Sequence, residues 1–119
     1  MRERPGAAPR GMVTAELAIA ISASVMVMVM LCWGIFVLVL QLRLVDTAGG
    51  VARQAARGDR VGVARAEAAA PRGARIVVER GTSSTRVTAQ LEADPFGPML
   101  PPVRLGARAE VTNEPGVGR

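Results

Sequence analysis

The chain has 119 residues, a formal net charge of +5, no His and a single Cys, Cys32. The lack of His removes the usual general base and a common zinc ligand, and one Cys cannot form an intramolecular disulfide. The basic residues are all Arg, and they are spread along the chain without interleaved aromatic residues. We therefore expect no cofactor, no metal, no nucleic-acid partner and no small-molecule substrate.

The most prominent feature is an uncharged run of 24 residues from Leu17 to Leu40. As a helix it would measure about 36 Å, which is enough to cross the roughly 30 Å hydrocarbon core of a bilayer with some tilt. Outside this run and a short leader, roughly 80 residues remain, enough for one small domain. The run predicts a transmembrane helix. Cys32 lies within it and is interpreted as a small hydrophobe, with lipidation or an intermolecular disulfide as alternatives.

The charges that flank this run favour one orientation. They are Arg2, Glu3, Arg4 and Arg10 before it, and Arg43, Asp46, Arg53 and Arg57 after it. Basic residues close to a membrane helix favour the cytoplasmic side, although the far side also carries some. We expect a single-pass protein with a cytoplasmic N-terminus and an extracytoplasmic C-terminal domain.

One acid, Glu16, stands at the start of the apolar run. A carboxylate in or beside a membrane helix is costly and usually has a partner. An ordinary cleaved signal peptide would instead show a small-residue cleavage site after the run, and no convincing one follows Leu40. The simplest alternative is that Glu16 is a carboxylate near a helix N-terminus, where the helix dipole favours negative charge.

The string Gly11-Met12-Val13-Thr14-Ala15-Glu16 follows a basic leader and resembles the type IV prepilin signature. The resemblance implies that a membrane aspartyl peptidase, the prepilin peptidase, cleaves after Gly11 and leaves Met12 as the mature N-terminus. Gly enters a peptidase cleft in extended form without a side-chain clash. Glu16 would then pair with the Met12 amine of its own or a neighbouring subunit. Cleavage removes three Arg and one Glu, which lowers the formal charge from +5 to +3.

Beyond Leu40 the pattern becomes amphipathic and predicts a stalk helix to about Arg57, stopped by Gly58-Asp59. A stripe of small or apolar residues recurs at three- and four-residue steps: Leu42, Val45, Gly49, Ala52 and Ala56. This stripe would pack either on neighbouring helices or on the chain's own sheet. Gly49-Gly50 disfavours an unbroken helix by about 1 kcal/mol per Gly, so we interpret the pair as a bend or a melted turn.

The remaining residues predict a small sheet. A helical stretch over 61–70, ended by Pro71, precedes three strands with alternating apolar residues over 75–80, 85–93 and 103–112. Gly81 to Ser84 reads as a turn, and the proline-rich segment 94–102 cannot be regular. Ile76, Val87 and Leu105 lie on the apolar side of their strands, and Arg104, Arg108 and Glu110 on the other. The pattern predicts an antiparallel meander covered by the stalk helix.

The expected fold class is therefore α+β: a long N-terminal transmembrane helix that continues into a stalk and packs on a three-stranded antiparallel sheet. We divide the chain into a leader (1–11), a transmembrane helix (12–40), a stalk (41–60), a small extracytoplasmic α+β domain (61–114) and a flexible tail (115–119). This plan resembles the TadE-like minor pilins or pseudopilins of tight-adherence systems in their short actinobacterial form. The matching strings are Val45-Asp46-Thr47-Ala48 and Val51-Ala52-Arg53-Gln54-Ala55-Ala56-Arg57-Gly58-Asp59, besides Gly11 to Glu16.

The resemblance implies a structural subunit that supports a pilus used in adhesion or secretion, with other pilin subunits, the pilus assembly platform and the prepilin peptidase as partners. A plain single-pass anchor that presents a small interaction domain in another membrane complex is the alternative. An enzyme is disfavoured, because the carboxylates Glu79, Glu92 and Asp94 are expected at the surface and form no catalytic constellation.

Overall fold

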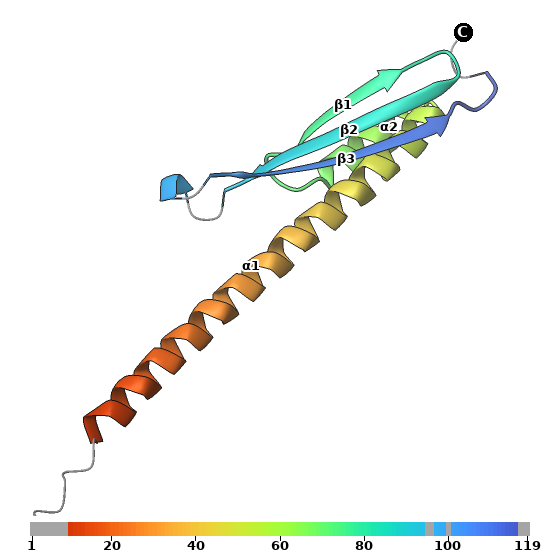
Figure 1. The fold of residues 1–119 in the computed structure, drawn as a ribbon. Helices are drawn as coiled ribbons and strands as arrows, with labels where there is room; N and C mark the ends of the chain where they lie inside the picture. The colour runs from red at the N-terminus through yellow and green to blue at the C-terminus, as the bar shows by residue number, and fades with distance from the viewer. Residues whose placement is uncertain (1–9, 95–96, 100, 117–119) are drawn as a thin grey trace, which may run out of the picture. The chain divides into compact units, whose positions relative to one another are not determined.

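The computed structural model describes residues 10–94, 97–99 and 101–116, in two helices, three strands and one short 3-10 helix (Figure 1). The proposed leader lies outside the described residues over 1–9, and the predicted tail does so over 117–119. The chain forms two compact units, residues 1–35 and 36–119, and helix α1 contributes to both. The predicted α+β class is confirmed.

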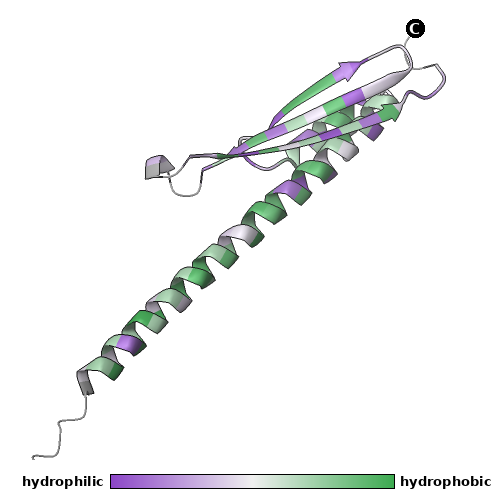
Figure 2. Ribbon diagram, viewed as in Figure 1, coloured by the Kyte–Doolittle hydropathy of each residue, from purple (hydrophilic) through white to green (hydrophobic). Residues whose placement is uncertain are grey.

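Helix α1 spans Arg10–Ala56. Its first part is predominantly apolar, and in Figure 2 it is mostly green, with a purple patch near its start. Gly49 and Gly50 lie inside this helix, so the predicted bend or melted turn at this pair is wrong. The low helix propensity of glycine is overridden because Leu44, Ala48 and Val51 bury this part of the helix against the domain.

Helix α2 spans Arg60–Ala68, slightly earlier than the predicted 61–70. Its N-cap is Asp59, whose carboxylate accepts a 2.9 Å hydrogen bond from the backbone N–H of Gly62. This bond satisfies one of the unpaired N–H groups of the first turn. Gly58 separates the two helices with a φ of 73°, a conformation that favours glycine.

The sheet has strands β1 (Arg75–Arg80), β2 (Ser84–Ala93) and β3 (Val103–Thr112), in the order β1-β2-β3. Both pairs are antiparallel, so the predicted meander is confirmed, with β2 one residue longer than expected. The β1–β2 turn is closed by the N–H of Gly81, which donates to the carbonyl of Ser84 at 2.8 Å. The segment predicted to be irregular contains one 3-10 turn, η1 (Gly97–Met99).

The core lies between the second half of α1, α2 and one face of the sheet (Figure 1). Alternation works as predicted: Val87, Ala89 and Leu91 on β2 are buried, and the residues between them are more exposed. The buried residues of α1 are Leu44, Ala48, Val51, Ala52, Ala55 and Ala56, with Thr47 beside them. The stalk helix therefore covers the apolar face of the sheet, as expected.

The predicted stripe on the stalk does not match this buried face. Ala52 and Ala56 are buried, but Leu42 and Val45 are 56% and 50% exposed. At 3.6 residues per turn, the buried face is rotated from the predicted stripe by about a quarter of a turn. Leu42 and Val45 are as large as Leu44 and Val51, so side-chain size does not distinguish the two faces; the buried face is the one on which Leu44, Ala48, Val51 and Ala55 recur at four-, three- and four-residue steps.

Candidate membrane and assembly site

The apolar surface of α1 is the largest candidate interaction surface. It is the one helix among the described residues that is long and apolar enough to cross a membrane, by length and composition, and its most apolar window has no buried residue. Exposed Met, Val, Leu and Ile side chains occupy every side of it. A helix that is apolar all round requires an apolar surrounding, from lipid or from other proteins. The chain is thus compatible with a single-pass membrane protein.

Polar side chains within this helix are satisfied locally. The hydroxyl groups of Ser22 and Ser24 donate to the carbonyls of Ala18 and Ala20, each at 2.8 Å. Such back-bonding leaves the hydroxyl proton paired without water, which suits a hydrocarbon surrounding. Cys32 is exposed on the same helix.

The residues of the predicted processing site lie in the first two turns of α1. The helix begins at Arg10, so Gly11 and Met12 are helical, and the predicted boundary after residue 11 falls inside the first turn. A Cβ atom at Gly11 would meet no atom within 4 Å beyond the adjacent helix backbone, and the carbonyl of Gly11 accepts a 3.0 Å hydrogen bond from the Thr14 hydroxyl. Glu16 is exposed, one turn beyond Met12. A peptidase would have to unwind this turn to bind Gly11 in extended form.

The second unit carries a contact that the sequence did not predict. The side-chain amide of Gln41 donates to the carbonyl of Gly106 at 2.8 Å. Gln41 is the first residue after the uncharged run, and Gly106 lies in the middle of β3. The two residues are 65 positions apart, so no local pattern pairs them. The only hint in the sequence was that Gln41, a polar residue, directly follows the apolar run.

A second contact ties the other end of β3 to α1. The backbone N–H of Glu114 donates to the carbonyl of Ala56 at 3.2 Å, and its carboxylate forms a 3.3 Å ion pair with Arg57. The helix C-terminus is thereby satisfied by the chain that follows β3. The Gln41–Gly106 and Ala56–Glu114 contacts show that β3 runs alongside the second half of α1 in the same direction.

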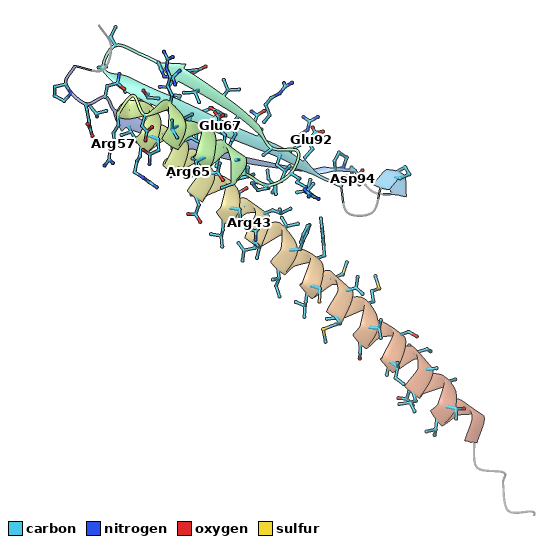
Figure 3. The ribbon with its side chains drawn as sticks, turned by 180° about the vertical axis from the view of Figure 1, so that it is seen from behind. Arg43, Arg57, Arg65, Glu67, Glu92 and Asp94 are labelled. Carbon is cyan, nitrogen blue, oxygen red and sulfur yellow. The ribbon has the colours of Figure 1, made fainter. Side chains whose placement is uncertain are left out.

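The carboxylates considered for catalysis are dispersed. Figure 3 shows Glu92 and Asp94 at the end of the sheet opposite to Arg57. Glu92 is exposed and forms a 3.2 Å ion pair with Arg104, and Glu79 is exposed on β1. Within the part of the chain that the structure describes, no three His, Cys, Asp or Glu side chains are grouped to hold a metal ion.

One carboxylate on the outer face of the sheet is electrostatically perturbed. The pKa of Glu110 is lowered by hydrogen bonds from the Ser84 hydroxyl and the Arg86 guanidinium, and by the positive charge of Arg86. The hydroxyl oxygen lies 2.7 Å from the carboxylate, and the ion pair with Arg86 measures 3.1 Å. These groups fasten β2 to β3 rather than forming a pocket for a ligand.

Comparisons of the chain with protein-family models, with curated proteins and with solved structures found no match in any of the three. The functional interpretation therefore depends on the features of the sequence and of the fold described above.

Proposed function

We propose that this chain is a structural subunit of the minor pilin or pseudopilin type, anchored in the membrane by α1 and assembled into an adhesion or secretion pilus. The observation that carries the proposal is the combination of a basic leader, Gly11, Glu16 and an apolar helix whose surface is left uncovered by the described chain. The packing of the same helix on a small antiparallel sheet supports it, since the resemblance to TadE-like proteins implies this plan.

In this proposal the two halves of α1 have separate tasks. The first half presents apolar side chains to lipid and, after assembly, to the helices of other subunits. Glu16 becomes a neutralised partner of a Met12 amine, because a single carboxylate in an apolar seam is otherwise penalised. The second half holds the sheet through Leu44 and Val51 and displays the domain on the extracytoplasmic side.

Processing is tested by expressing the chain in a host with an active prepilin peptidase and measuring its intact mass. We expect the mass of residues 12–119 for the native chain and the full-length mass for Gly11→Ala. Gly6→Ala is the matched control, because it changes another glycine of the leader outside the predicted site. A native chain that keeps residues 1–11 in this host contradicts the proposal.

Assembly is tested separately in a host whose pilus system incorporates the processed chain. Glu16→Ala should lower its recovery in sheared surface fibres at least several-fold, without lowering the amount of processed protein in the membrane. Thr14→Ala is a control on the same helical segment. If Glu16→Ala is incorporated as well as the native chain, the alternative of a plain single-pass anchor with a small interaction domain gains support.

A further inference from the structure

At one end of the sheet, β1 stops short of its neighbours. It begins at Arg75, which pairs with Gln90, whereas β2 continues to Ala93 and stays paired there with Val103 of β3. The last three residues of β2 therefore have a neighbouring strand on one side only. The open side lies where β1 would continue if it were longer.

The chain that precedes β1 turns away from this open side. Gly73 has a φ of 84°, and the N–H of Ala74 donates to the carbonyl of Pro71 at 3.0 Å, so this stretch forms a turn instead of extending β1. A hollow of about 780 Å³ lies beside the turn. Its lining includes Gly73, Arg75, Glu92 and Arg104, with Leu91 and Leu105 as its apolar part.

The backbone of β2 directs one donor and one acceptor toward the open side. The N–H of Gly81 donates to the carbonyl of Ser84, and hydrogen-bonding residues alternate along an antiparallel pair. Every second residue from Ser84 to Glu92 therefore directs its N–H and C=O toward the side of β1. The residues between them face β3, which agrees with the bond from the N–H of Asn113 to the carbonyl of Ser83.

Glu92 is the member of this series that lies beyond the start of β1. Its N–H and C=O consequently have no backbone partner among the residues that the structure describes. An unpaired strand edge of this kind is a template for an added extended segment. The added segment has to end here, because β1 itself occupies the positions that follow in the same line.

Two unpaired charges of opposite sign stand on either side of Glu92. The carboxylate of Glu92 is neutralised by Arg104 at 3.2 Å. Arg75, opposite Gln90, and Asp94, directly after β2, are exposed and form no ion pair among the described residues. Figure 3 shows Asp94 next to Glu92 at this end of the sheet. A bound segment complements both charges if it is negative beside Arg75 and positive beside Asp94.

We propose that this hollow binds the carboxyl-terminal segment of a partner protein, which adds to β2 as a short antiparallel strand in line with β1. In this direction the chain terminus meets β1, so its carboxylate accepts the N–H of Glu92 and pairs with the guanidinium of Arg75. The N–H of the same terminal residue donates to the carbonyl of Glu92. A basic residue two positions earlier lies opposite Asp94.

The opposite chain direction is excluded by charge, because it brings an amino-terminal ammonium group to Arg75. The inference goes beyond the proposed function and depends neither on the membrane anchor nor on a pilus. Failure of the peptide experiments below therefore leaves the processing and assembly tests unaffected.

Binding is measured by fluorescence anisotropy with the full-length chain in micelles. The probe is the peptide Gly-Ser-Lys-Val-Ala, which carries a fluorophore on its amino end and a free carboxyl terminus. Its carboxyl-terminal amide is the matched control, since it lacks only the terminal charge. We expect the amide to bind about ten-fold more weakly than the free acid, because it loses a charge-assisted hydrogen bond.

Arg75→Gln should weaken binding of the free acid to the level of the amide and leave binding of the amide unchanged. Arg80→Gln is the control variant, because it removes the same charge from the other end of β1. Three results overturn the proposal: no saturable binding of the free acid, equal affinities for acid and amide, or equal losses in Arg75→Gln and Arg80→Gln. Displacement of the peptide by inorganic phosphate at the same concentration also overturns it, since a general anion site would suffice.

The direction and pairing of the added strand are tested separately. Replacing the Lys of the peptide by Glu should weaken binding several-fold on the native chain and much less on Asp94→Asn. Amide hydrogen exchange of Glu92, measured by NMR, should slow several-fold when the free acid binds. Exchange of Leu91, whose N–H faces β3, should stay the same. Unchanged exchange at Glu92 with bound peptide contradicts strand addition.

Discussion

At the scale of single residues, a cluster of Ser84, Arg86 and Glu110 joins β2 to β3 on the outer face of the sheet. Glu110 accepts hydrogen bonds from Ser84 and Arg86, which lie beside it on β2. The side chains of Arg86 and Glu110 are 49% and 47% exposed, so the ion pair by itself contributes little in water. Its effect is most visible as a dependence of stability on pH.

The pH dependence has a defined sign. Because the pKa of Glu110 is lower in the folded protein than in the unfolded chain, the carboxylate stabilises the fold above the unfolded pKa, and this contribution disappears as the pH falls through the folded pKa. We expect Glu110→Gln to remove this part of the loss of stability in acid. Denaturant titrations at a series of pH values below neutrality, in micelles, measure it.

The control for this prediction is Glu67→Gln on α2, which makes the same change of charge at an exposed residue outside the ion pairs of the described chain. A Glu110→Gln variant whose stability falls with acid as steeply as that of the native chain would contradict the assigned role of Glu110.

At the scale of the elements, the buried face of α1 determines how the helix holds the sheet. Leu44 is fully buried against this core, whereas Leu42, two residues earlier, is 56% exposed. Leu44→Ala should reduce the free energy of unfolding by about 2–5 kcal/mol, because it leaves a cavity. Leu42→Ala should change it by less than about 0.5 kcal/mol. Denaturation of the domain in micelles, followed by circular dichroism, compares the two.

This pair also discriminates between the two faces of the stalk. If Leu42→Ala destabilises the domain as much as Leu44→Ala, the stripe that contains Leu42 packs on the chain's own sheet. A loss of fibre incorporation by Leu42→Ala at unchanged stability would instead show that the exposed stripe contacts another subunit.

The sequence predicted the alternation of the strands well but did not identify the buried face of the stalk, for a physical reason. Strand periodicity is two, and Val87, Ala89 and Leu91 alternate with polar residues, so only one face can be buried. Along the stalk, Ala, Gly and Val occur on several sides of the helix, and composition alone does not select among them. The spacing of Leu44, Ala48, Val51 and Ala55 is a regular four-three-four pattern that could have identified the true face.

The sequence could suggest candidate site residues only where they lie close together along the chain. Gly11, Met12 and Glu16 form a linear motif, so the sequence was sufficient to propose it. The contact of Gln41 with Gly106 depends on the crossing of a helix and a strand that are distant along the chain.

At the scale of the whole second unit, Asn113, directly after β3, connects several parts of the domain by hydrogen bonds. Its side-chain oxygen accepts a 2.7 Å hydrogen bond from the Thr85 hydroxyl, and its amide donates to the carbonyl of Gly81 at 2.9 Å. Its backbone N–H donates to Ser83, and the next residue, Glu114, caps α1. Asn113 thus links the β1–β2 turn to the core strand β2, and Glu114 links the same segment to the end of the stalk.

Asn113→Ala should therefore destabilise the domain by about 1–3 kcal/mol, because the Thr85 side chain is only 1% exposed and its hydroxyl would lose its partner. Thr85→Val removes that hydroxyl, so the double variant should be destabilised by less than the two single changes together. Denaturation of all four proteins in micelles gives the coupling energy, which we expect at about 0.5–3 kcal/mol for residues in contact. Strict additivity would mean that the Asn113 side chain does not hold β2 through the Thr85 hydroxyl.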